Sequence, residues 1–467
     1  MGRNPSIIEK HRGFNPPLGL LYLASSIKRF TEHDVEVLDA QPLKYTYAQL
    51  ESYFKEKPYD IVGITALTFT LVDVRKTAKL IKKLIPHSKV IIGGWHTHIF
   101  PDETMQWEEV DLALMGEAEF SFVELLKNLN DKSSYHKITG LAYKDDQGRL
   151  IKNRFSPIAD LDALSFPDRE ILRVDNYGSI LSHERIATTM ISSRGCPYSC
   201  AFCDRPFSPI GSHLRMRSPK NIVDEIQSCL GLGIKQFLFY DDTFTVNKNR
   251  VLGICEEILN RKINIEWVIR SRIDTVDENI LRMLKKAGCG VIHYGVESGS
   301  DRILKEIKKG FTTRQVRDIF SLTKKVGIET LAYFMIGLPG ENLTDIQNTY
   351  DLAKGLRPDY AHFTVFSPYP ATELYARGLQ EGIIKNDVWR EFARNPDEHF
   401  KVPVWEKNFS RQQLYGILVK LYKDFYLRPS YFVNRLKKIK SGHDFFKKTK
   451  AGLSVFFMQK ESLDKAL

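Results

Sequence analysis

The sequence predicts an α/β protein with an N-terminal doubly wound parallel sheet, a central partial (βα)6 barrel and a C-terminal helical region. Its 467 residues exceed one ordinary core, so two or three domains are expected. Short β-branched or aromatic runs alternate with longer amphipathic stretches, as in βα units around parallel sheets. Apolar residues make up 43% and charged residues 27%, the proportions of a globular protein.

The first domain is expected over residues 1–150. Its strand candidates are Val35–Leu38, Asp60–Thr65, Val90–Gly93 and Leu112–Met115. Its helix candidates are Leu18–Phe30, Tyr47–Lys55, Val72–Leu84 and Phe120–Asn128. A doubly wound sheet binds ligands at the carboxyl ends of its strands, where Gly93, Gly94, Gly116 and Glu117 stand. Glycine there lets a ligand approach the backbone, but on composition alone tight turns are the simpler explanation.

The barrel is expected over residues 185–380, after a connection over residues 151–184 that shows little periodicity. Its six strand candidates are Ala187–Ile191, Gln236–Tyr240, Ile265–Ile269, Gly290–Tyr294, Thr330–Ile336 and Ala361–Val365. In parallel barrels the active-site groups lie at the carboxyl ends of the strands.

Residues 381–467 form the expected C-terminal helical, basic region. The stretch Leu414–Phe425 has helical spacing, and Tyr431–Lys440 is basic and amphipathic. The second stretch suits either an anionic membrane surface or a solvated face packed on the barrel. Residues 411–467 carry 13 Lys and Arg against 4 Asp and Glu, which is +9 of the total net charge of +11. The remaining +2 argues against a nucleic-acid partner for the body of the protein.

The sequence shows no membrane span or signal peptide. No apolar run approaches the roughly 20 residues that cross a bilayer, and the N-terminus lacks the apolar core of a signal peptide. We therefore expect a cytoplasmic protein, with peripheral contact to the inner membrane face through the basic tail as one alternative.

Cys196, Cys200 and Cys203 follow the first barrel strand at C-x3-C-x2-C spacing. Three thiolates at this spacing suit three corners of an iron–sulfur cube, with the fourth iron left open. The alternatives are a structural zinc site or a chance grouping. Zinc sites usually close with a fourth Cys or His, and the nearest downstream histidine, His213, stands at no recognised spacing.

The motif, with Phe202 before its last cysteine, resembles the signature of the radical S-adenosylmethionine (SAM) enzymes. The resemblance implies a 4Fe-4S cluster whose open iron binds the amino and carboxylate groups of SAM. Cleavage of SAM would then yield a 5'-deoxyadenosyl radical, with electrons from a donor such as flavodoxin or ferredoxin.

Polar groups after the second, third and fourth barrel strands match the family's SAM-binding positions. By resemblance, Asp241 or Asp242 would receive the ammonium of SAM, although an N-cap role explains one of them nearly as well. Arg272 would meet the carboxylate of SAM, because its fork of donors suits one. Glu297, in the motif Gly-Val-Glu-Ser-Gly-Ser, would accept hydrogen bonds from SAM; its alternative is an ion pair with Lys308 or Lys309.

The motif Met335–Glu341 after the fifth strand matches a further family element. By resemblance, Ile336 and Gly337 would face the adenine of SAM together with Phe202, and the alternative for Ile336 is simple burial in the core.

The first domain resembles the cobalamin-binding domain that precedes many radical SAM barrels. Thr65-x-Leu67 stands where those domains often have Ser-x-Leu, and Gly93-Gly94 matches their paired glycines beside the nucleotide tail of cobalamin. Gly116-Glu117 is the last motif in this order. The order of the motifs, combined with the barrel that follows, supports the resemblance more strongly than any single motif does.

Two departures accompany this second resemblance. The D-x-H-x-x-G motif that supplies an axial histidine to cobalt is absent, so no histidine ligand is expected from that loop; His96 and His98 suit a second-shell or solvent-facing position. The chain also begins where the family's first strand should have ended, so we expect a native start upstream or an incomplete domain.

The resemblance implies a cobalamin-dependent radical SAM enzyme, similar to the anaerobic magnesium-protoporphyrin ester cyclases and cobalamin-dependent C-methylases. Methyl transfer to an unactivated carbon is the preferred reaction. The alternatives are oxidative cyclisation or rearrangement without methyl transfer, and a cobalamin-binding sensor with an inactive barrel. The substrate would be a small molecule, with a lipid or tetrapyrrole as the suggested class, and the sequence names no catalytic residue.

Overall fold

A computed structural model describes residues 13–178, 186–205, 211–431 and 455–458. The chain divides into two compact units. Among described residues, unit 1 comprises Pro17–Asn176 and Asn386–Lys401, and unit 2 comprises residues 13–16, Tyr177–Lys385 and the parts after Val402. No helix in the described ranges is long and apolar enough to cross a membrane.

Unit 1 is built on a five-stranded sheet of order β1-β2-β3-β4-β5. The strands are β1 (Ile61–Thr65), β2 (Lys89–Gly93), β3 (Leu112–Leu114), β4 (Leu141–Lys144) and β5 (Leu150–Lys152). The first three run parallel, as predicted, whereas β4 and β5 add an antiparallel hairpin that the periodicity did not indicate.

Helices cover both faces of this sheet. They are α2 (Leu18–Phe30), α3 (Tyr47–Glu56), α4 (Leu71–Leu84), α5 (Trp95–Ile99), α6 (Pro101–Met105) and α7 (Glu119–Lys127). Ile91 of β2 faces a core made by α2 and α7, and its neighbours Val90 and Ile92, which are also buried, point to the opposite face. This alternation explains why β2 reads as a continuous apolar run.

The predicted strand Val35–Leu38 is wrong, because those residues carry no strand in the structure. Side chains hold this segment instead of a backbone ladder. Glu36 accepts hydrogen bonds from Tyr53 (2.9 Å), Tyr59 (2.8 Å) and Lys57 (2.7 Å). Val35 still packs against the apolar core of the unit.

Unit 2 contains a six-stranded, entirely parallel sheet of order β13-β12-β11-β10-β9-β6. Its strands are β6 (Thr188–Met190), β9 (Gln236–Phe239), β10 (Glu266–Ser271), β11 (Cys289–Glu297), β12 (Glu329–Ile336) and β13 (Tyr360–Val365). All six predicted strands are present. Each strand pairs with the next along the chain, the order that a partial barrel requires.

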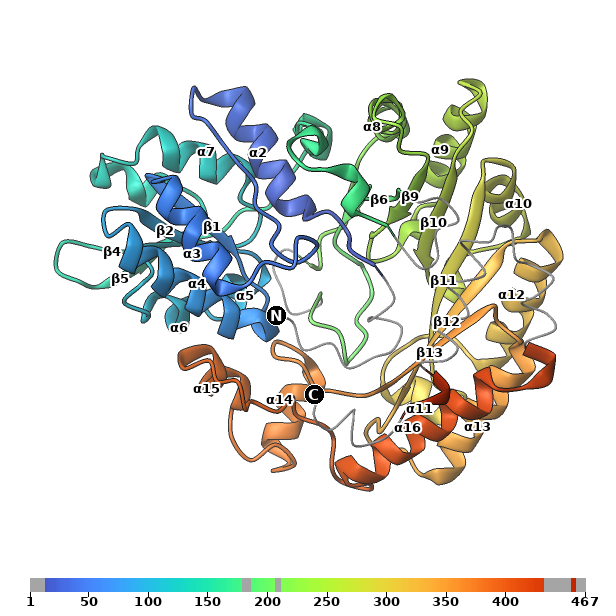
Figure 1. The fold of residues 1–467 in the computed structure, drawn as a ribbon. Helices are drawn as coiled ribbons and strands as arrows, with labels where there is room; N and C mark the ends of the chain where they lie inside the picture. The colour runs from blue at the N-terminus through green and yellow to red at the C-terminus, as the bar shows by residue number, and fades with distance from the viewer. Residues whose placement is uncertain (1–12, 179–185, 206–210, 432–454, 459–467) are drawn as a thin grey trace. The chain divides into compact units, whose positions relative to one another are not determined.

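The connecting helices lie along one side of this sheet (Figure 1). They are α8 (Pro219–Gly231), α9 (Lys248–Asn260), α10 (Glu278–Lys286), α12 (Thr313–Val326) and α13 (Leu343–Leu356). The shorter α11 (Asp301–Glu306) and α14 (Glu373–Gln380) follow β11 and β13, and the small pair β7 (Ser193–Arg194) and β8 (Arg215–Met216) follows β6. Helices on one side leave the other face of the sheet available for side chains that serve a site.

The C-terminal region divides between the two units. Helix α15 (Val388–Arg394) belongs to unit 1, where it contacts α6, and α16 (Arg411–Tyr426) packs on β13 in unit 2. The predicted helix Leu414–Phe425 is therefore confirmed as part of α16. Of the basic stretch Tyr431–Lys440, all but Tyr431 lies outside the described residues.

Candidate active site

The three motif cysteines lie on a loop that follows β7 at the carboxyl end of the parallel sheet. The N–H of Cys196 donates to the carbonyl of Gly211 (2.7 Å). The N–H of Ala201 donates to the carbonyl of Ile307 (3.0 Å), and its carbonyl accepts from the N–H of Leu374 (3.1 Å). These bonds tie the loop to the end of α11 and the start of α14.

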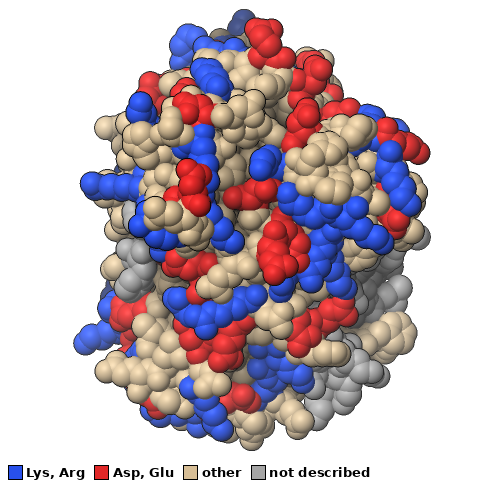
Figure 2. Space-filling view, turned by 90° about the vertical axis from the view of Figure 1, so that its left-hand side faces the viewer, with Lys and Arg blue, Asp and Glu red and all other residues tan. Residues whose placement is uncertain are grey.

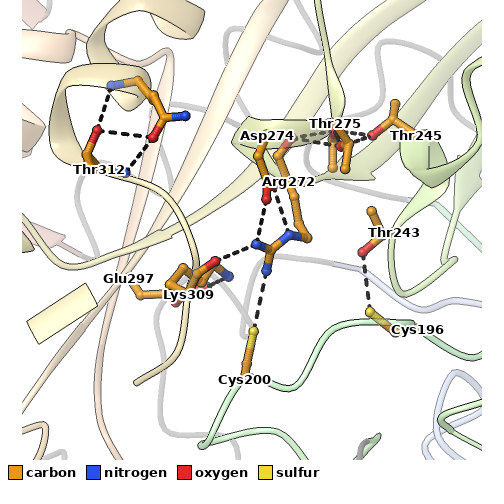
Figure 3. A network of polar contacts seen from close by, with 12 residues as sticks. Cys196, Cys200, Thr243, Thr245, Arg272, Asp274, Thr275, Glu297, Lys309 and Thr312 are labelled. Carbon is orange, nitrogen blue, oxygen red and sulfur yellow. Dashed lines mark hydrogen bonds and ion pairs between the residues drawn. The ribbon is translucent and has the colours of Figure 1, made fainter. Parts of the chain in front are cut away.

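Each thiol has a polar neighbour. Arg272 Nη1 donates to Cys200 Sγ at 3.4 Å, and Thr243 Oγ1 lies 3.7 Å from Cys196 Sγ (Figure 3). Asp204 Oδ1 lies 3.9 Å from Cys203 Sγ. Burial raises the pKa of the Cys196 thiol, and that of Cys203 to about 12. A bound metal cation would favour the thiolate forms of these cysteines.

This donor set fits an iron–sulfur cluster, because each thiolate of such a cluster binds its own iron and the three sulfurs need not converge. In the described parts of the chain, no three His, Cys, Asp or Glu side chains are gathered closely enough to hold a single metal ion.

Arg272 lies directly beyond β10 and is 6% exposed. Its guanidinium donates two bonds to Asp274, both of 2.9 Å, and another to the carbonyl of Lys309. It also stacks over the ring of Tyr198, 3.7 Å from its centroid. The predicted SAM-binding arginine is thus held rigidly beside the sulfur of Cys200.

Glu297 forms a buried ion pair with Lys309, whose Nζ lies 2.9 Å from Glu297 Oε1. The geometry of β11 makes room for the pair. A bulge follows Gly295, and a Cβ on Gly295 would come within 2.5 Å of Glu297 Oε1 and 3.1 Å of Lys309 Nζ. The ion-pair alternative from the sequence is therefore present, and it lies next to the cysteine loop, with Lys309 Nζ 5.4 Å from the ring of Phe202.

The adjacent acids after β9 have different surroundings. Asp241 is 1% exposed and accepts from the Ser192 N–H (2.7 Å) and from the hydroxyls of Ser192 (2.5 Å) and Ser193 (2.6 Å). Asp242 is more exposed and pairs with Arg205 at 3.1 Å. Asp241 braces the strand that leads into the cysteine loop, which leaves Asp242 as the more accessible carboxylate.

Ile336 is fully buried at the end of β12, which agrees with the alternative prediction that it is a core residue. The following Gly337 has φ +79° and lies against Leu414 of α16. Its N–H and that of Leu338 both donate to the same oxygen of Glu341.

In unit 1, Thr65 and Gly93 are register partners at the carboxyl ends of β1 and β2. The adjacent Gly94 has φ +101°, and a Cβ there would meet the Ala66 carbonyl at 2.7 Å, so only glycine suits the position. Leu67 and Phe69 are 43% and 56% exposed beside it. An exposed apolar loop next to a side-chain-free backbone fits the flat, largely apolar face of a corrin ring.

Gly116 and Glu117 contact the chain that follows β5. A Cβ on Gly116 would come within 2.3 Å of the ring of Phe155, and Glu117 Oε2 accepts from the Ile158 N–H (2.8 Å). His96 is fully buried between aromatic rings, and burial lowers its pKa to about 3, whereas His98 is half-buried near Trp95 and Phe155. His96 is thus a core residue rather than a second-shell or solvent-facing one.

A row of polar side chains across the parallel sheet was missed by the motif search. Four neighbouring strands contribute Arg270, His293, Tyr333 and His362, and Tyr240 directly follows β9. The sequence feature that could have revealed them is a polar residue on one face of strands whose other residues are mostly apolar.

Comparison with known proteins agrees with this architecture. Residues 190–353 match the Radical SAM superfamily, and residues 6–126 match the B12 binding domain. An uncharacterized methyltransferase of Pyrococcus horikoshii is 34% identical over 90% of this chain and 89% of its own length. The anaerobic magnesium-protoporphyrin IX monomethyl ester cyclase of Rubrivivax gelatinosus is 27% identical over 89% of this chain and 74% of its own.

Among solved structures, the cobalamin-dependent S-adenosylmethionine radical enzyme OxsB shares the fold. Its structure with aqua-cobalamin and S-adenosylmethionine bound has a TM-score of 0.74 at 19% identity and covers 97% of this chain and 70% of its own. The fold, the cysteine loop and the two matched domains therefore lead to one conclusion: the chain belongs to the cobalamin-dependent radical SAM enzymes, in which a B12-binding domain precedes a radical SAM domain.

Proposed function

We propose that this enzyme transfers a methyl group to an unactivated carbon of a small-molecule substrate. The name of the 34% identical relative, a methyltransferase, supports methyl transfer. When bound, the cluster and cobalamin would supply reductive cleavage of SAM and a transferable methyl group. What the chain itself supplies is binding, orientation and electrostatics.

The observation that carries the proposal is the convergence at Arg272. This one side chain touches Cys200 Sγ, the Lys309 carbonyl and the ring of Tyr198, so it links the cysteine loop to the Glu297–Lys309 pair. Cys196, Cys200 and Cys203 would hold three irons, and Arg272 would orient the carboxylate of SAM at the fourth. Its rigid support by Asp274 means that little reorganisation is needed when SAM binds.

The remaining polar groups would hold the rest of SAM. Asp242 would receive the ammonium group, Glu297 would accept hydrogen bonds, and the backbone of Ile336 and Gly337, together with Phe202, would lie toward the adenine. In unit 1, Thr65, Leu67, Gly93 and Gly94 would contact cobalamin, with Gly116 and Glu117 shaping the neighbouring loop.

Two products of SAM test methyl transfer. Anaerobically purified enzyme, reconstituted with iron, sulfide and cobalamin, is supplied with methyl-labelled SAM and a reductant. Because methyl donation and radical formation each consume one SAM, a methyltransferase forms S-adenosylhomocysteine and 5'-deoxyadenosine in equal amounts and places the label in its product. A candidate small-molecule substrate must be present as the methyl acceptor. Substrate that is modified with formation of deoxyadenosine, but without S-adenosylhomocysteine and without label, would refute the proposal.

Matched cysteine variants control this test. Cys200→Ser removes one cluster thiolate and should abolish deoxyadenosine formation together with most of the bound iron. Cys229→Ser changes a buried cysteine of α8 outside the loop and should keep both. Equal activity of the two variants would contradict the assignment of the cluster.

Oxidative cyclisation is the second candidate, because the chain also matches a cyclase over most of its length. It would yield deoxyadenosine and an unlabelled product in the same experiment.

The names of the cyclase relatives also suggest a tetrapyrrole as the substrate, and a lipid is the alternative substrate class. We further infer a flavodoxin or ferredoxin as electron donor; membrane contact through the basic tail is one alternative to a tail that packs on the barrel.

Basic and acidic side chains are interspersed on the face that Figure 2 shows. Exposed ion pairs of the described residues include Lys132–Asp146 and Lys152–Asp102. Such a surface does not favour a polyanionic partner, which supports a small-molecule substrate over nucleic acid.

A further inference from the structure

The row defined by Tyr240, Arg270, His293, Tyr333 and His362, here named the inner row, lies on one face of the parallel sheet. Arg270 and His293 are register partners on β10 and β11, and Tyr333 and His362 are register partners on β12 and β13. Parallel partners point to the same side of a sheet, so these side chains share a face.

This face is the one opposite the helices. Tyr294, which follows His293 on β11, contacts Phe320 of α12 and shares a hydrogen bond with Thr323. Phe363, which follows His362 on β13, contacts Tyr422 of α16. Since neighbouring residues on a strand point in opposite directions, the inner row points away from both helices.

The members of the row are in contact from strand to strand. The Arg270 guanidinium lies 4.1 Å from the ring centroid of Tyr240, and the Tyr333 hydroxyl lies 3.1 Å from His293 Nδ1. The rings of Tyr333 and His362 are 5.4 Å apart. Asn15 Nδ2 donates to the Tyr240 hydroxyl at 2.9 Å, which extends the row at the other end.

The inner row lies one side-chain layer below the cysteine loop. Arg270 lies on β10, two residues before Arg272, which directly follows the strand and is the neighbour of Cys200 Sγ. Two residues of a strand span about 7 Å. A substrate held by the row would therefore lie next to SAM at the open iron.

The inner row consists of one cationic side chain, Arg270, and neighbouring side chains that can donate hydrogen bonds. It contains no carboxylate, and its guanidinium, phenol and imidazole groups can all donate hydrogen bonds. In the described ranges no acidic side chain pairs with Arg270, whose contact is the aromatic face of Tyr240. A half-buried guanidinium without a carboxylate partner is costly to keep unless an anion meets it.

We propose that the inner row binds an oxyanion of the substrate, either a carboxylate or a phosphoryl group, with Arg270 as its principal partner. This inference rests on the proposed function and names its substrate class. Arg272, just beyond β10, is already held by Asp274 and would orient SAM, so Arg270 on β10 is the arginine that would orient the substrate. A purely hydrocarbon substrate would bring no anion to Arg270.

The test measures anion binding to reconstituted enzyme that is saturated with S-adenosylhomocysteine, so that the site for the SAM carboxylate is filled. Propionate serves as the carboxylate probe and methylphosphonate as the phosphoryl probe, each followed by saturation-transfer NMR. The variants are Arg270→Gln, Arg270→Lys and, as a matched control, Arg282→Gln on the exposed face of α10, where Arg282 pairs with Glu278.

We expect at least one probe to bind saturably to the wild type and to Arg282→Gln. Its affinity should fall at least tenfold in Arg270→Gln and be partly restored in Arg270→Lys, which keeps the charge. Preference for propionate identifies a carboxylate substrate, and preference for methylphosphonate identifies a phosphoryl one.

Equal binding by Arg270→Gln, or no binding of either probe to the wild type, would overturn the inference. Iron content and S-adenosylhomocysteine affinity are measured on every protein, and Arg270→Gln should match the wild type in both. Failure of the wild type to bind iron or S-adenosylhomocysteine would instead count against the proposed function, so the two failures are distinguishable.

Discussion

Single side chains in this site carry charge in very different surroundings. Glu297 and Lys309 have side chains 10% and 7% exposed, whereas the adjacent Lys308 and its partner Glu373 are 50% and 38% exposed. A buried pair depends on both members, because removal of one leaves an uncompensated charge away from water. An exposed pair is screened by solvent and contributes little.

Lys309→Met should therefore lower the free energy of unfolding by about 3 kcal/mol, the typical cost of breaking a buried pair. Lys308→Met removes an equivalent side chain one residue away, with a cost of less than about 1 kcal/mol expected for an exposed pair. Urea unfolding of both variants measures the difference. Equal losses would mean that the Glu297–Lys309 pair is not buried as described.

Substitutions of the two adjacent aspartates should have different effects: one should lower stability and the other should weaken SAM binding. Asp241→Asn replaces one carboxylate oxygen with an N–H₂ group that faces at least one of the donors around it, and it removes the charge opposite the buried Arg250 (3.5 Å). We expect a loss of about 2 kcal/mol in stability, as for buried donors left without acceptors. Asp242→Asn disturbs a more exposed pair with Arg205 and should instead weaken SAM binding. Urea unfolding and calorimetric titration with S-adenosylhomocysteine and SAM measure the two effects. The reverse pattern would reassign the ammonium-binding role to Asp241.

At the scale of elements, α16 closes the free edge of the parallel sheet. The Tyr422 hydroxyl donates to the Phe363 carbonyl (2.9 Å) and accepts from its N–H (3.2 Å). Tyr426 makes the same two bonds to Ala361, at 2.7 and 3.0 Å. Side chains one helical turn apart thus match strand residues two apart, and they occupy backbone groups that a further strand would use.

Tyr422→Phe should lower the free energy of unfolding by about 1–3 kcal/mol, because it leaves buried backbone groups without a hydrogen-bond partner. Hydrogen exchange should accelerate at the Phe363 amide and not at Ala361, and Tyr426→Phe should give the opposite pattern. Tyr350→Phe is the control, because its exposed hydroxyl reaches only the Asp424 carbonyl at 3.3 Å. Exchange that rises equally at both amides would indicate general loosening of α16.

The turn between β12 and α13 contains a carboxyl group whose protonation is coupled to folding. Burial raises the pKa of Glu341 from 4.5 to about 8. The folded protein thus holds a proton that the unfolded chain releases. This contribution to stability is fully present below pH 4.5 and is lost as the pH rises through 8.

Glu341→Gln keeps an oxygen acceptor for the N–H groups of Gly337 and Leu338 but cannot ionise. Relative to the wild type, the variant should gain about 3 kcal/mol of stability between pH 5.5 and 8.5, because about 2.5 pH units of this range lie below the folded pKa of Glu341. Urea unfolding at both pH values measures the gain. Glu373→Gln, an exposed carboxylate, should show no such trend, and a pH-independent difference for Glu341→Gln would contradict the raised pKa.

At the scale of the whole molecule, local patterns predicted the strands of unit 2 and the cysteine loop, because buried parallel strands and closely spaced thiols are both readable over a few residues. The side-chain partners of Arg272, Glu297 and Asp241 could not be predicted from such local patterns. Lys309 lies 12 residues from Glu297 and Ser192 lies 49 from Asp241, so only the folded sheet brings them together. The Val35–Leu38 error arose because an apolar run says nothing about whether a neighbouring strand exists to pair with it.

The predicted boundaries at residues 150, 184 and 380 assume that each domain is one continuous stretch, whereas Asn386–Lys401 belongs to unit 1. We propose that this segment completes the B12-binding domain. Trp107, which is 1% exposed, donates from Nε1 to the carbonyls of Ala393 (3.2 Å) and Arg394 (3.1 Å), and Arg390 pairs with the buried Glu103 at 2.8 Å. Without the segment, the Trp107 N–H and the Glu103 carboxylate would lose these partners.

A synthetic peptide of residues 386–401 should accordingly bind a fragment of residues 17–176 and raise its melting temperature as the peptide concentration increases, because a ligand of the folded state stabilises it by mass action. Trp107→Phe in the fragment removes the indole donor while keeping an aromatic ring, so the peptide should bind it several-fold more weakly. A peptide carrying Arg390→Ala should lose affinity for the parent fragment in the same way. If the peptide leaves the melting temperature unchanged while the fragment itself unfolds cooperatively, the domain is complete without it and the segment is only an attached helix.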